Sequence, residues 1–216
     1  MWLLTSGPTR EHLDSVRFLT NASSGRMGFA IAEAALARDH EVTIVQGPVA
    51  LSPPPRAHVL PVVSAIEMLE SAALVLERGD VEALIGVAAV CDFRPARKLA
   101  GKPAKSAVPR QLDLVLNPDV LAELTARRLA RVHIGFALQS MRTPEEERVA
   151  FSAARSKLAR KGLDAIVLNG AAAMESDASH AYWIPARGED VDLGVADKTV
   201  HARRLVACIE ELLVRR

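Results

Sequence analysis

A run of small and polar residues, from Thr20 to Gly28, reads Thr-Asn-Ala-Ser-Ser-Gly-Arg-Met-Gly and lies between a short apolar strand and an amphipathic helix. The first backbone N–H groups of a helix have no internal partner, and the helix dipole adds partial positive charge there. Ser23, Ser24 and Gly25 therefore favour an anion site, which a phosphate can approach closely because glycine has no Cβ. The run predicts a phosphate-bearing ligand, although it lacks the Gly-x-Gly-x-x-Gly dinucleotide spacing.

A carboxylate, Asp92, lies just past the apolar run 84–90. Ligands of open parallel sheets bind beyond the carboxyl ends of the strands, so Asp92 is a candidate acceptor for a ribose hydroxyl or a base amine. The structural alternative is that Asp92 caps a loop or pairs with Arg94. We favour the functional interpretation because binding residues gather at such strand ends. Ser6 also follows a predicted strand, and Asn169 ends another.

Three lysines are candidates for binding phosphate or base. Lys102 lies in the run 101–106, which has few apolar residues and predicts a loop that can close over a polyphosphate. Taken alone, Lys102 is more typical of a solvated surface. Lys157 and Lys161 share one helix face and precede the strand that ends at Asn169, so they either reach the strand-end site or are solvated.

Metal and hydrolase motifs are missing from the sequence. It has no His-x-x-x-His or Cys-x-x-Cys pattern, no Gly-x-Ser-x-Gly elbow and no Gly-x-x-x-x-Gly-Lys-Ser/Thr loop. We therefore expect no structural metal. Mg²⁺ carried on nucleotide phosphates leaves little trace in a sequence, so its presence stays open.

The composition indicates one globular α/β domain over residues 1–216. Half of the 216 residues are hydrophobic and the net charge is +1, which argues against a dedicated nucleic-acid binder. Cys91 and Cys208 form no disulfide framework, so a cytoplasmic location is expected. The apolar N-terminal run is too short for a signal peptide or a membrane span.

Apolar runs alternate with segments of helical period, which predicts a Rossmann-like, doubly wound and mainly parallel sheet in an α/β fold. Ser64 with Glu67 forms a capping-box pattern at the start of one helix, and Asn117 before Pro118 forms an N-cap pattern at another. A small peripheral hairpin is expected near the C-terminus. The predicted strands cover 2–5, 41–46, 58–62, 83–90, 132–138 and 164–169, the helices 27–38, 64–78, 118–130, 145–161 and 199–214, and the hairpin 181–186 with 190–195.

Several segments together resemble one enzyme family. The segments cover residues 6–11, 14–18, 21–28, 45–49, 88–95, 117–119 and 135–136. The pattern Asn-x-Ser-Ser-Gly-x-Met-Gly, followed later by Ala-Ala-Val-x-Asp, resembles phosphopantothenate–cysteine ligase, and the similarity extends to about Asn169. The resemblance implies coenzyme A synthesis: a nucleoside triphosphate, with CTP favoured over ATP, activates the carboxylate of 4′-phosphopantothenate, and the amine of L-cysteine then displaces the nucleoside monophosphate.

The resemblance also implies cofactors and partners. The chain begins at the ligase's first strand, so a stand-alone ligase without flavin is expected, with Mg²⁺ accompanying the nucleotide. A homodimer is expected, in which the substrate site borrows from the partner subunit. No nucleic acid or membrane partner is expected.

The resemblance also implies roles for residues of this chain that match the family's motifs. Asn21 matches the asparagine linked to the acyl-nucleotide intermediate, and its amide is expected to hydrogen-bond the activated carbonyl. Lys102 matches the first lysine of the activation loop, in which Ala104 replaces a usual lysine. The implied nucleotide-binding residues are Ser23, Ser24, Gly25, Gly86, Val87, Ala88, Asp92, Lys102, Pro118, Asp119, Val120, Leu121, Phe136, Lys157 and Lys161, and the implied substrate-binding residues are Arg17, Asn21, Ala88 and Ala89.

Two other classes of function remain open at this point. An NAD(P)-dependent Rossmann oxidoreductase predicts a glycine fingerprint after the first strand and an acid after the second, whereas this chain has Gly7-Pro8 and Gln46-Gly47 there. A non-catalytic nucleotide-binding regulator would bind CTP or ATP without releasing pyrophosphate. Lys102 and Asn21 favour catalysis over that regulator.

Overall fold

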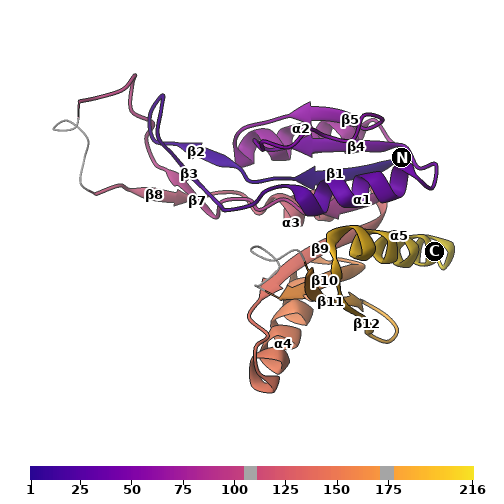
Figure 1. Cartoon of the computed structure of the whole chain (residues 1–216). Helices are drawn as coiled ribbons and strands as arrows, with labels where there is room; N and C mark the ends of the chain where they lie inside the picture. The colour runs from indigo at the N-terminus through magenta and orange to yellow at the C-terminus, as the bar shows by residue number, and fades with distance from the viewer. Residues whose placement is uncertain (105–110, 171–177) are drawn as a thin grey trace.

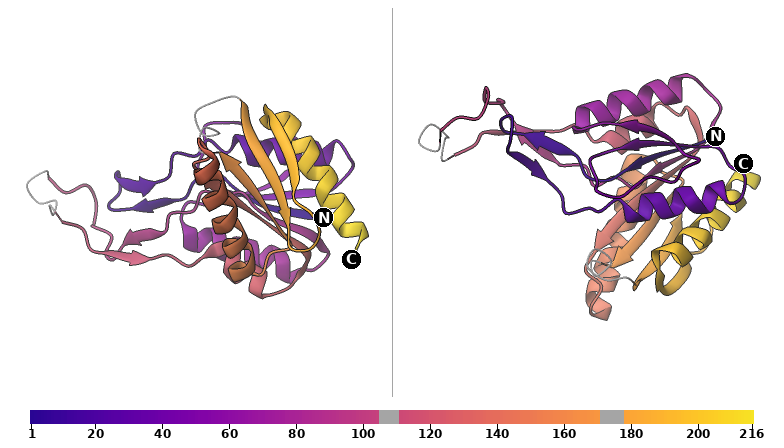
Figure 2. Two further views of the ribbon diagram at one scale, coloured as in Figure 1. Left: turned by 90° about the horizontal axis from the view of Figure 1, so that it is seen from below. Right: turned by 45° about the horizontal axis from the view of Figure 1, so that its top comes forward.

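An eight-stranded sheet with helices on both faces forms the centre of the computed structural model, which describes residues 1–104, 111–170 and 178–216 (Figures 1 and 2). The strand order is β12 (Val191–Asp197), β11 (Ala178–Pro185), β10 (Ala165–Gly170), β9 (Ala130–Gln139), β6 (Val81–Gly86), β1 (Trp2–Ser6), β4 (Val42–Gln46) and β5 (His58–Pro61). All neighbours from β10 to β5 pair in parallel, and β11 and β12 pair antiparallel. The predicted Rossmann-like α/β fold is confirmed.

The central strands β1, β4 and β10 are buried on both faces of the sheet, because their residues are mostly apolar. Trp2 and Leu4 pack on one face beneath α1 (Arg26–Leu36) and α5 (Lys198–Val214), while Leu3 packs on the other face beneath α2 (Ala65–Glu77). That second face is also covered by α3 (Val120–Ala126) and α4 (Pro144–Lys161). Strands covered on both faces explain the near-continuous apolar runs of the sequence.

The chain reverses its direction of travel across the sheet at β1. From β1 it moves outward through β4 and β5, then returns to the other side of β1 through β6, β9 and β10. Helices on opposite faces therefore diverge between β1 and β6, which leaves a crevice beyond the carboxyl ends of these strands.

Local signals place most helix boundaries, with one shift. Ser64 caps α2 by accepting from the Glu67 N–H at 3.2 Å, as the capping-box pattern predicts. The helix predicted over 118–130 is shorter, because Asp119 rather than Asn117 is its N-cap and Arg128 adopts a φ of 53° before β9 begins. Within the described ranges, none of the helices combines the length and apolar character that a membrane crossing requires.

The C-terminal hairpin is longer than expected and belongs to the central sheet. Residues 178–185 and 191–197 form β11 and β12, which extend the sheet beyond β10. Val167 of β10 pairs with Trp183 of β11, and Trp183 is buried in the core under α5. The hairpin is therefore the sheet's edge, and its start adjoins residues outside the described part of the chain.

Two short β-ribbons form an arm that projects from the sheet (Figure 1). The sequence analysis did not predict this arm. One ribbon pairs β2 (Arg10–His12) with β3 (Phe18–Thr20), and the other pairs β7 (Phe93–Pro95) with β8 (Leu114–Leu116). The ribbons lie side by side in the views of Figures 1 and 2. We call residues 10–20, 93–104 and 111–116 the arm. Large apolar side chains are exposed on it at Phe93, Leu114, Val115 and Leu116.

Candidate functional site

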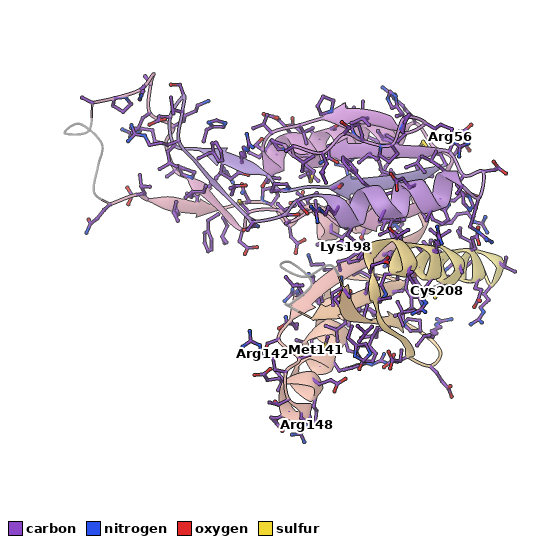
Figure 3. All side chains as sticks on the ribbon, in the orientation of Figure 1. Arg56, Met141, Arg142, Arg148, Lys198 and Cys208 are labelled. Atoms are coloured by element: carbon purple, nitrogen blue, oxygen red, sulfur yellow. The ribbon has the colours of Figure 1, made fainter. Side chains whose placement is uncertain are left out.

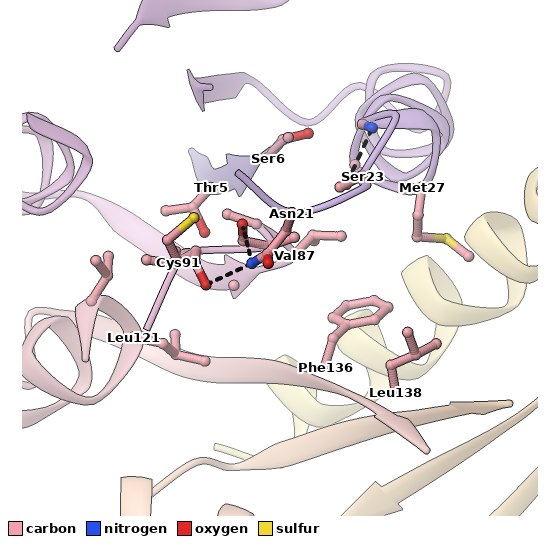
Figure 4. Close-up of a pocket in the computed structure, with 18 of the residues that line it drawn as sticks. Thr5, Ser6, Asn21, Ser23, Met27, Val87, Cys91, Leu121, Phe136 and Leu138 are labelled. Carbon is pink, nitrogen blue, oxygen red and sulfur yellow. Dashed lines mark hydrogen bonds between the residues drawn. The ribbon is translucent and has the colours of Figure 1, made fainter. Parts of the chain in front are cut away.

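A cavity of about 710 Å³ opens at the carboxyl edge of β1, β6, β9 and β10, where the switch in strand order leaves the crevice. It brings together segments that are far apart in the chain, including the start of α1 and the loop after β6 (Figure 4). The last two turns of α4 also line it. The predicted site residues that line the cavity are Asn21, Ser23, Ser24, Gly25, Gly86, Val87, Ala88, Ala89, Asp92, Pro118, Asp119, Val120, Leu121, Phe136, Lys157 and Lys161.

The start of α1 presents backbone donors to this cavity. Gly25 is the N-cap with a φ of 76°, a left-handed conformation that L side chains rarely adopt, and no side chain caps the helix. Ser23 Oγ lies 3.5 Å from the Gly25 nitrogen, and residues 26–28 of the first turn also line the cavity. The N–H groups of a first turn have no acceptor inside the helix, so this end of the cavity suits an anion.

Close packing brings α1 against the end of β1. A Cβ at Gly28 would lie 2.2 Å from Ser6 Oγ, so only glycine allows this approach. Among the described residues, Ser6 Oγ and Asn169 Oδ1 are buried without a hydrogen-bond partner, and both residues line the cavity. Lys198, at the start of α5 (Figure 3), also lines the cavity. Sequence analysis placed Ser6 and Asn169 at strand ends but gave them no role, and it missed Lys198 because the hairpin's return to the sheet was not foreseen.

Asn21 points its side-chain nitrogen at the loop after β6. Asn21 Nδ2 donates to the carbonyl oxygens of Ala89 at 3.1 Å and Val90 at 3.0 Å (Figure 4). Both hydrogens of the amide are therefore committed to the backbone, and only Oδ1, an acceptor, remains for a ligand. This geometry differs from the expectation that the Asn21 amide donates to an activated carbonyl.

Asp92 is exposed in the cavity, and Arg94, its expected structural partner, hydrogen-bonds other residues. Arg94 Nη1 donates to the Leu116 carbonyl at 2.6 Å and to Asn117 Oδ1 at 3.1 Å. Asn117 Nδ2 in turn donates to the Cys91 carbonyl at 2.8 Å. Asn117 thus holds the loop that carries Asp92, instead of capping α3 as predicted.

The two helix α4 lysines reach the cavity from one side. Lys157 Nζ donates to the Phe136 carbonyl at 2.7 Å, and Lys161 Nζ lies 2.6 Å from Asp119 Oδ1. Burial lowers the pKa of Lys157, and the neighbouring charge of Lys161 lowers it further. Burial opposes ionisation of Asp119, yet hydrogen bonds from Lys161 and the Ala122 N–H hold the pKa of Asp119 below its ordinary value.

Arg17 and Lys102 are not among the residues that line the cavity; both lie on the arm. Arg17 Nε bonds Asp14 Oδ2 at 2.7 Å, and Arg17 Nη2 donates to the Pro103 carbonyl at 3.3 Å. The arm therefore brings Arg17 close to the segment that carries Lys102, while both stay apart from the cavity of their own chain. Lys105, in the same loop, lies outside the described residues.

Metal-ligating side chains do not cluster in the part of the chain that the structure describes. Residues 1–104, 111–170 and 178–216 contain no group of three or more His, Cys, Asp or Glu that could hold a metal ion. Cys91 is buried against the cavity, and burial raises the pKa of its thiol. Neither cysteine is part of a disulfide.

The fold and the cavity define a Rossmann-like α/β domain whose ligand site lies at the topological switch point. The chain belongs to the family described as the DNA/pantothenate metabolism flavoprotein C-terminal domain, whose model matches residues 1–213.

Proteins of coenzyme A biosynthesis are among its relatives. The chain is 37% identical over 191 residues to the coenzyme A biosynthesis bifunctional protein CoaBC of Escherichia coli K12, an alignment covering 84% of the chain and 45% of that protein. It is 36% identical over 222 residues to CoaBC of Mycolicibacterium smegmatis, covering 98% of the chain and 52% of that protein. The chain therefore spans about half the length of these relatives.

Solved structures agree with this membership. The crystal structure of the C-terminal domain of CoaBC matches with a TM-score of 0.82 at 33% identity, covering 99% of this chain and 95% of that one. The DNA/pantothenate metabolism flavoprotein from Streptococcus pneumoniae matches with a TM-score of 0.81 at 24% identity, covering 97% of both chains, and supports the fold. The chain is thus homologous to the C-terminal part of CoaBC.

Proposed function

We propose that this domain joins 4′-phosphopantothenate to L-cysteine at the expense of a nucleoside triphosphate. The observation that carries the proposal is one cavity that combines an uncapped helix start, the Asn21 acceptor and the Lys157–Lys161 pair. The chain is homologous to a protein of coenzyme A biosynthesis, and this homology supports 4′-phosphopantothenate and L-cysteine as the substrates.

The reaction would proceed in two balanced steps. A carboxylate oxygen of phosphopantothenate attacks the α-phosphorus of the nucleotide, an oxygen–phosphorus bond forms, and pyrophosphate leaves. The cysteine nitrogen then attacks the acyl carbon, a carbon–nitrogen bond forms, and the nucleoside monophosphate leaves while the amine loses a proton. Holding two substrates in one cavity supplies much of the acceleration, because the reacting groups are already oriented.

The cavity walls suggest where the nucleotide lies. The first-turn N–H groups of α1 suit the phosphates, and Asp92 suits a ribose hydroxyl or an exocyclic amine. Lys157 and Lys161 supply donors beside Leu121, which packs so closely on Gly86 that a Cβ there would meet it at 2.7 Å. Two adjacent acceptors on a small base, O2 and N3 of cytosine, match these donors, so we propose CTP over ATP.

Mg²⁺ would enter on the nucleotide phosphates, where it neutralises charge during nucleotidyl transfer. The exposed carboxylate of Asp92 offers the hard oxygen ligand that Mg²⁺ prefers, and the buried, unpartnered Oδ1 of Asn169 offers a second among the described residues. No flavin is part of the proposed reaction, because neither step transfers electrons.

Asn21 would act in the second step. Its one available atom, Oδ1, accepts hydrogen bonds, whereas carboxylates and phosphates offer no donor to it. The amine of cysteine is a donor, so we assign Asn21 Oδ1 to orient this amine for attack. The sequence-based role, donation to the acyl carbonyl, is replaced by this one.

The homodimer would place the arm of one subunit against the cavity of the other. Phe93, Leu114 and Leu116 are 48%, 46% and 70% exposed, and their clustering on one ribbon marks an association surface. Arg17 and Lys102, which lie apart from their own cavity, would then serve the partner's cavity: Arg17 binding substrate and Lys102 stabilising the transferred phosphoryl group.

The experiment that tests the function measures pyrophosphate release by purified protein with phosphopantothenate and Mg²⁺. CTP is compared with ATP, each with and without cysteine. We expect release that requires phosphopantothenate, runs faster with CTP, and turns over repeatedly only with cysteine. Folded protein that binds CTP but releases no pyrophosphate would instead identify a non-catalytic nucleotide-binding regulator.

A further inference from the structure

Thr9 is a completely buried residue just beyond β1 that connects two segments of the cavity wall. Its Oγ1 accepts from the Cys91 N–H at 3.0 Å, and its carbonyl oxygen accepts from Thr20 Oγ1 at 2.7 Å. Thr20 immediately precedes Asn21, and Cys91 immediately follows Val90. Thr9 therefore touches both chain segments that meet at the Asn21 side chain.

These bonds close a ring with the Asn21 amide. Three hydrogen bonds and two peptide bonds form the ring. The Cys91 N–H donates to Thr9 Oγ1, and a peptide bond joins Cys91 to Val90, whose carbonyl oxygen accepts from Asn21 Nδ2 at 3.0 Å. A second peptide bond joins Asn21 to Thr20, whose hydroxyl donates to the Thr9 carbonyl oxygen. We call these five residues the Thr9 ring. A second path runs beside it, because the Thr9 N–H donates to the Ala89 carbonyl at 3.4 Å and the same oxygen accepts from Asn21 Nδ2 at 3.1 Å.

The ring fixes which atom Asn21 turns to the cavity. Rotation of the amide would break its bonds to two carbonyl oxygens, and movement of the loop that supplies those oxygens would break the bond between Thr9 and Cys91. An exposed asparagine is otherwise free to rotate about χ2. Thr9 thus removes that freedom without itself reaching the cavity.

We propose that Thr9 is a positioning residue, which holds Asn21 Oδ1 as an acceptor for the incoming amine. This role rests on the proposed function and adds a residue to it. The hydroxyl is the essential part, since a methyl group in its place leaves the buried Cys91 N–H without an acceptor. Misplacing a substrate-orienting group by about 1 Å costs up to ~100-fold in rate.

Thr9→Val, Thr9→Ser and the control Thr43→Val test the role. Thr43 is also a buried threonine, but its hydroxyl donates to the Met1 sulfur at 3.2 Å, and Thr43 does not line the cavity. We expect Thr9→Val to slow the cysteine-dependent step by about 10- to 100-fold and to leave single-turnover pyrophosphate release within about twofold. Thr9→Ser and Thr43→Val should behave like the wild type in both steps.

A double-mutant cycle separates positioning from a merely structural role. If Thr9 acts through Asn21, Thr9→Val adds less than about twofold to the defect of Asn21→Ala, because the group that it positions is already gone. Full additivity of the two defects would overturn the role, as would equal losses in both steps. These results are distinguishable from failure of the proposed function, in which the wild type itself releases no pyrophosphate.

Thr20→Val provides a second route should Thr9→Val fail to fold. Thr20 is exposed, and this change removes the ring's other hydrogen bond to Thr9 without altering the core. We expect the same selective loss in the cysteine step, together with faster hydrogen exchange of the Asn21 side-chain amide by NMR. Unchanged exchange and an unchanged cysteine step in Thr20→Val would contradict the ring's role.

Discussion

Lys157 Nζ lies 2.7 Å from the carbonyl oxygen of Phe136, so a lysine of α4 is held at the end of a neighbouring strand. Burial lowers the pKa of Lys157 below its ordinary value of 10.5. A lysine donates most strongly to the acceptors of the base while it is protonated, that is, below its pKa. As the pH rises, nucleotide affinity should therefore begin to fall at a lower pH than it would if Lys157 were an exposed lysine.

Lys157→Arg should remove this alkaline loss of affinity, because arginine stays charged to far higher pH. We expect CTP titrations in the absence of cysteine, from about pH 7 to pH 10, to show weakening in the wild type and little change in the variant. Equal weakening in both proteins would mean that Lys157 is not the group whose titration limits binding.

Lys102→Gln should lower pyrophosphate release by about 100-fold or more while leaving the melting temperature unchanged, since the residue is exposed and would stabilise only the transferred phosphoryl group. Lys98→Gln is the matched control, because Lys98 is an exposed lysine of the same arm. Near-normal release by Lys102→Gln, or an equal loss in Lys98→Gln, would remove Lys102 from the reaction.

Mixing two inactive variants tests whether Lys102 acts across a dimer. If Lys102 serves the partner's cavity, Lys102→Gln mixed with Asn21→Ala yields heterodimers with one intact site, and about one quarter of wild-type activity returns after random exchange. Activity that stays at the level of the separate variants would place Lys102 and Asn21 in the same subunit's site.

If the proposed dimer forms through the arm, Leu114→Glu should yield a monomer, because it places a charge on the exposed apolar ribbon of the arm. Leu74→Glu is the control: Leu74 is 59% exposed, but it lies on α2 and apart from the arm. Sedimentation velocity measures both. A Leu114→Glu protein that sediments as the wild type does would show that the arm does not form the interface.

The stability of the fold should depend on Asp164 in acid. Although burial opposes ionisation, hydrogen bonds from the side chain and N–H of His133, with the charge of Arg216, hold the pKa of Asp164 below its ordinary value of 3.8. The stabilisation is therefore complete above about pH 3.8 and is lost as the pH falls through the lower folded-state pKa.

Asp164→Asn should lower the free energy of unfolding by about 1–3 kcal/mol at neutral pH, because it disturbs buried donors, and the gap to the wild type should close in acid. Urea unfolding at several pH values measures this gap. Asp190→Asn, which breaks a surface pair with Arg155, should cost far less. A gap that stays constant down to acid pH would rule out ionised Asp164 as its source.

Much of the fold follows from local patterns in the sequence. The apolar runs place the six parallel strands, although the strand predicted over 83–90 covers 81–86, and Ser64 with Glu67 places the start of α2. The arm could not be predicted in this way, because β2 consists of Arg10, Glu11 and His12 and carries no apolar alternation. Asn117 and Asp119 are equally good N-cap types, so the sequence could not decide which one caps α3.

The position of the candidate site could be predicted from the strand ends, but the hydrogen-bond donors and acceptors that it presents to a ligand could not. The Asn21 amide bonds residues 68 and 69 positions away, a pairing that depends on the three-dimensional fold. The same holds for Arg17 and Lys102, whose separation from their own cavity is a property of the arm. Sequence patterns identify such residues, but the three-dimensional structure determines which of their atoms face a ligand.

The most direct test follows an oxygen label from the carboxylate of 4′-phosphopantothenate. In the proposed reaction the carboxylate attacks the α-phosphorus, so cleavage by cysteine transfers one ¹⁸O into the nucleoside monophosphate, which mass spectrometry detects. We predict labelled CMP, unlabelled pyrophosphate and one equivalent of amide product. Label in orthophosphate, or product formed with no label in CMP, would contradict activation through an acyl-nucleotide and with it the central claim.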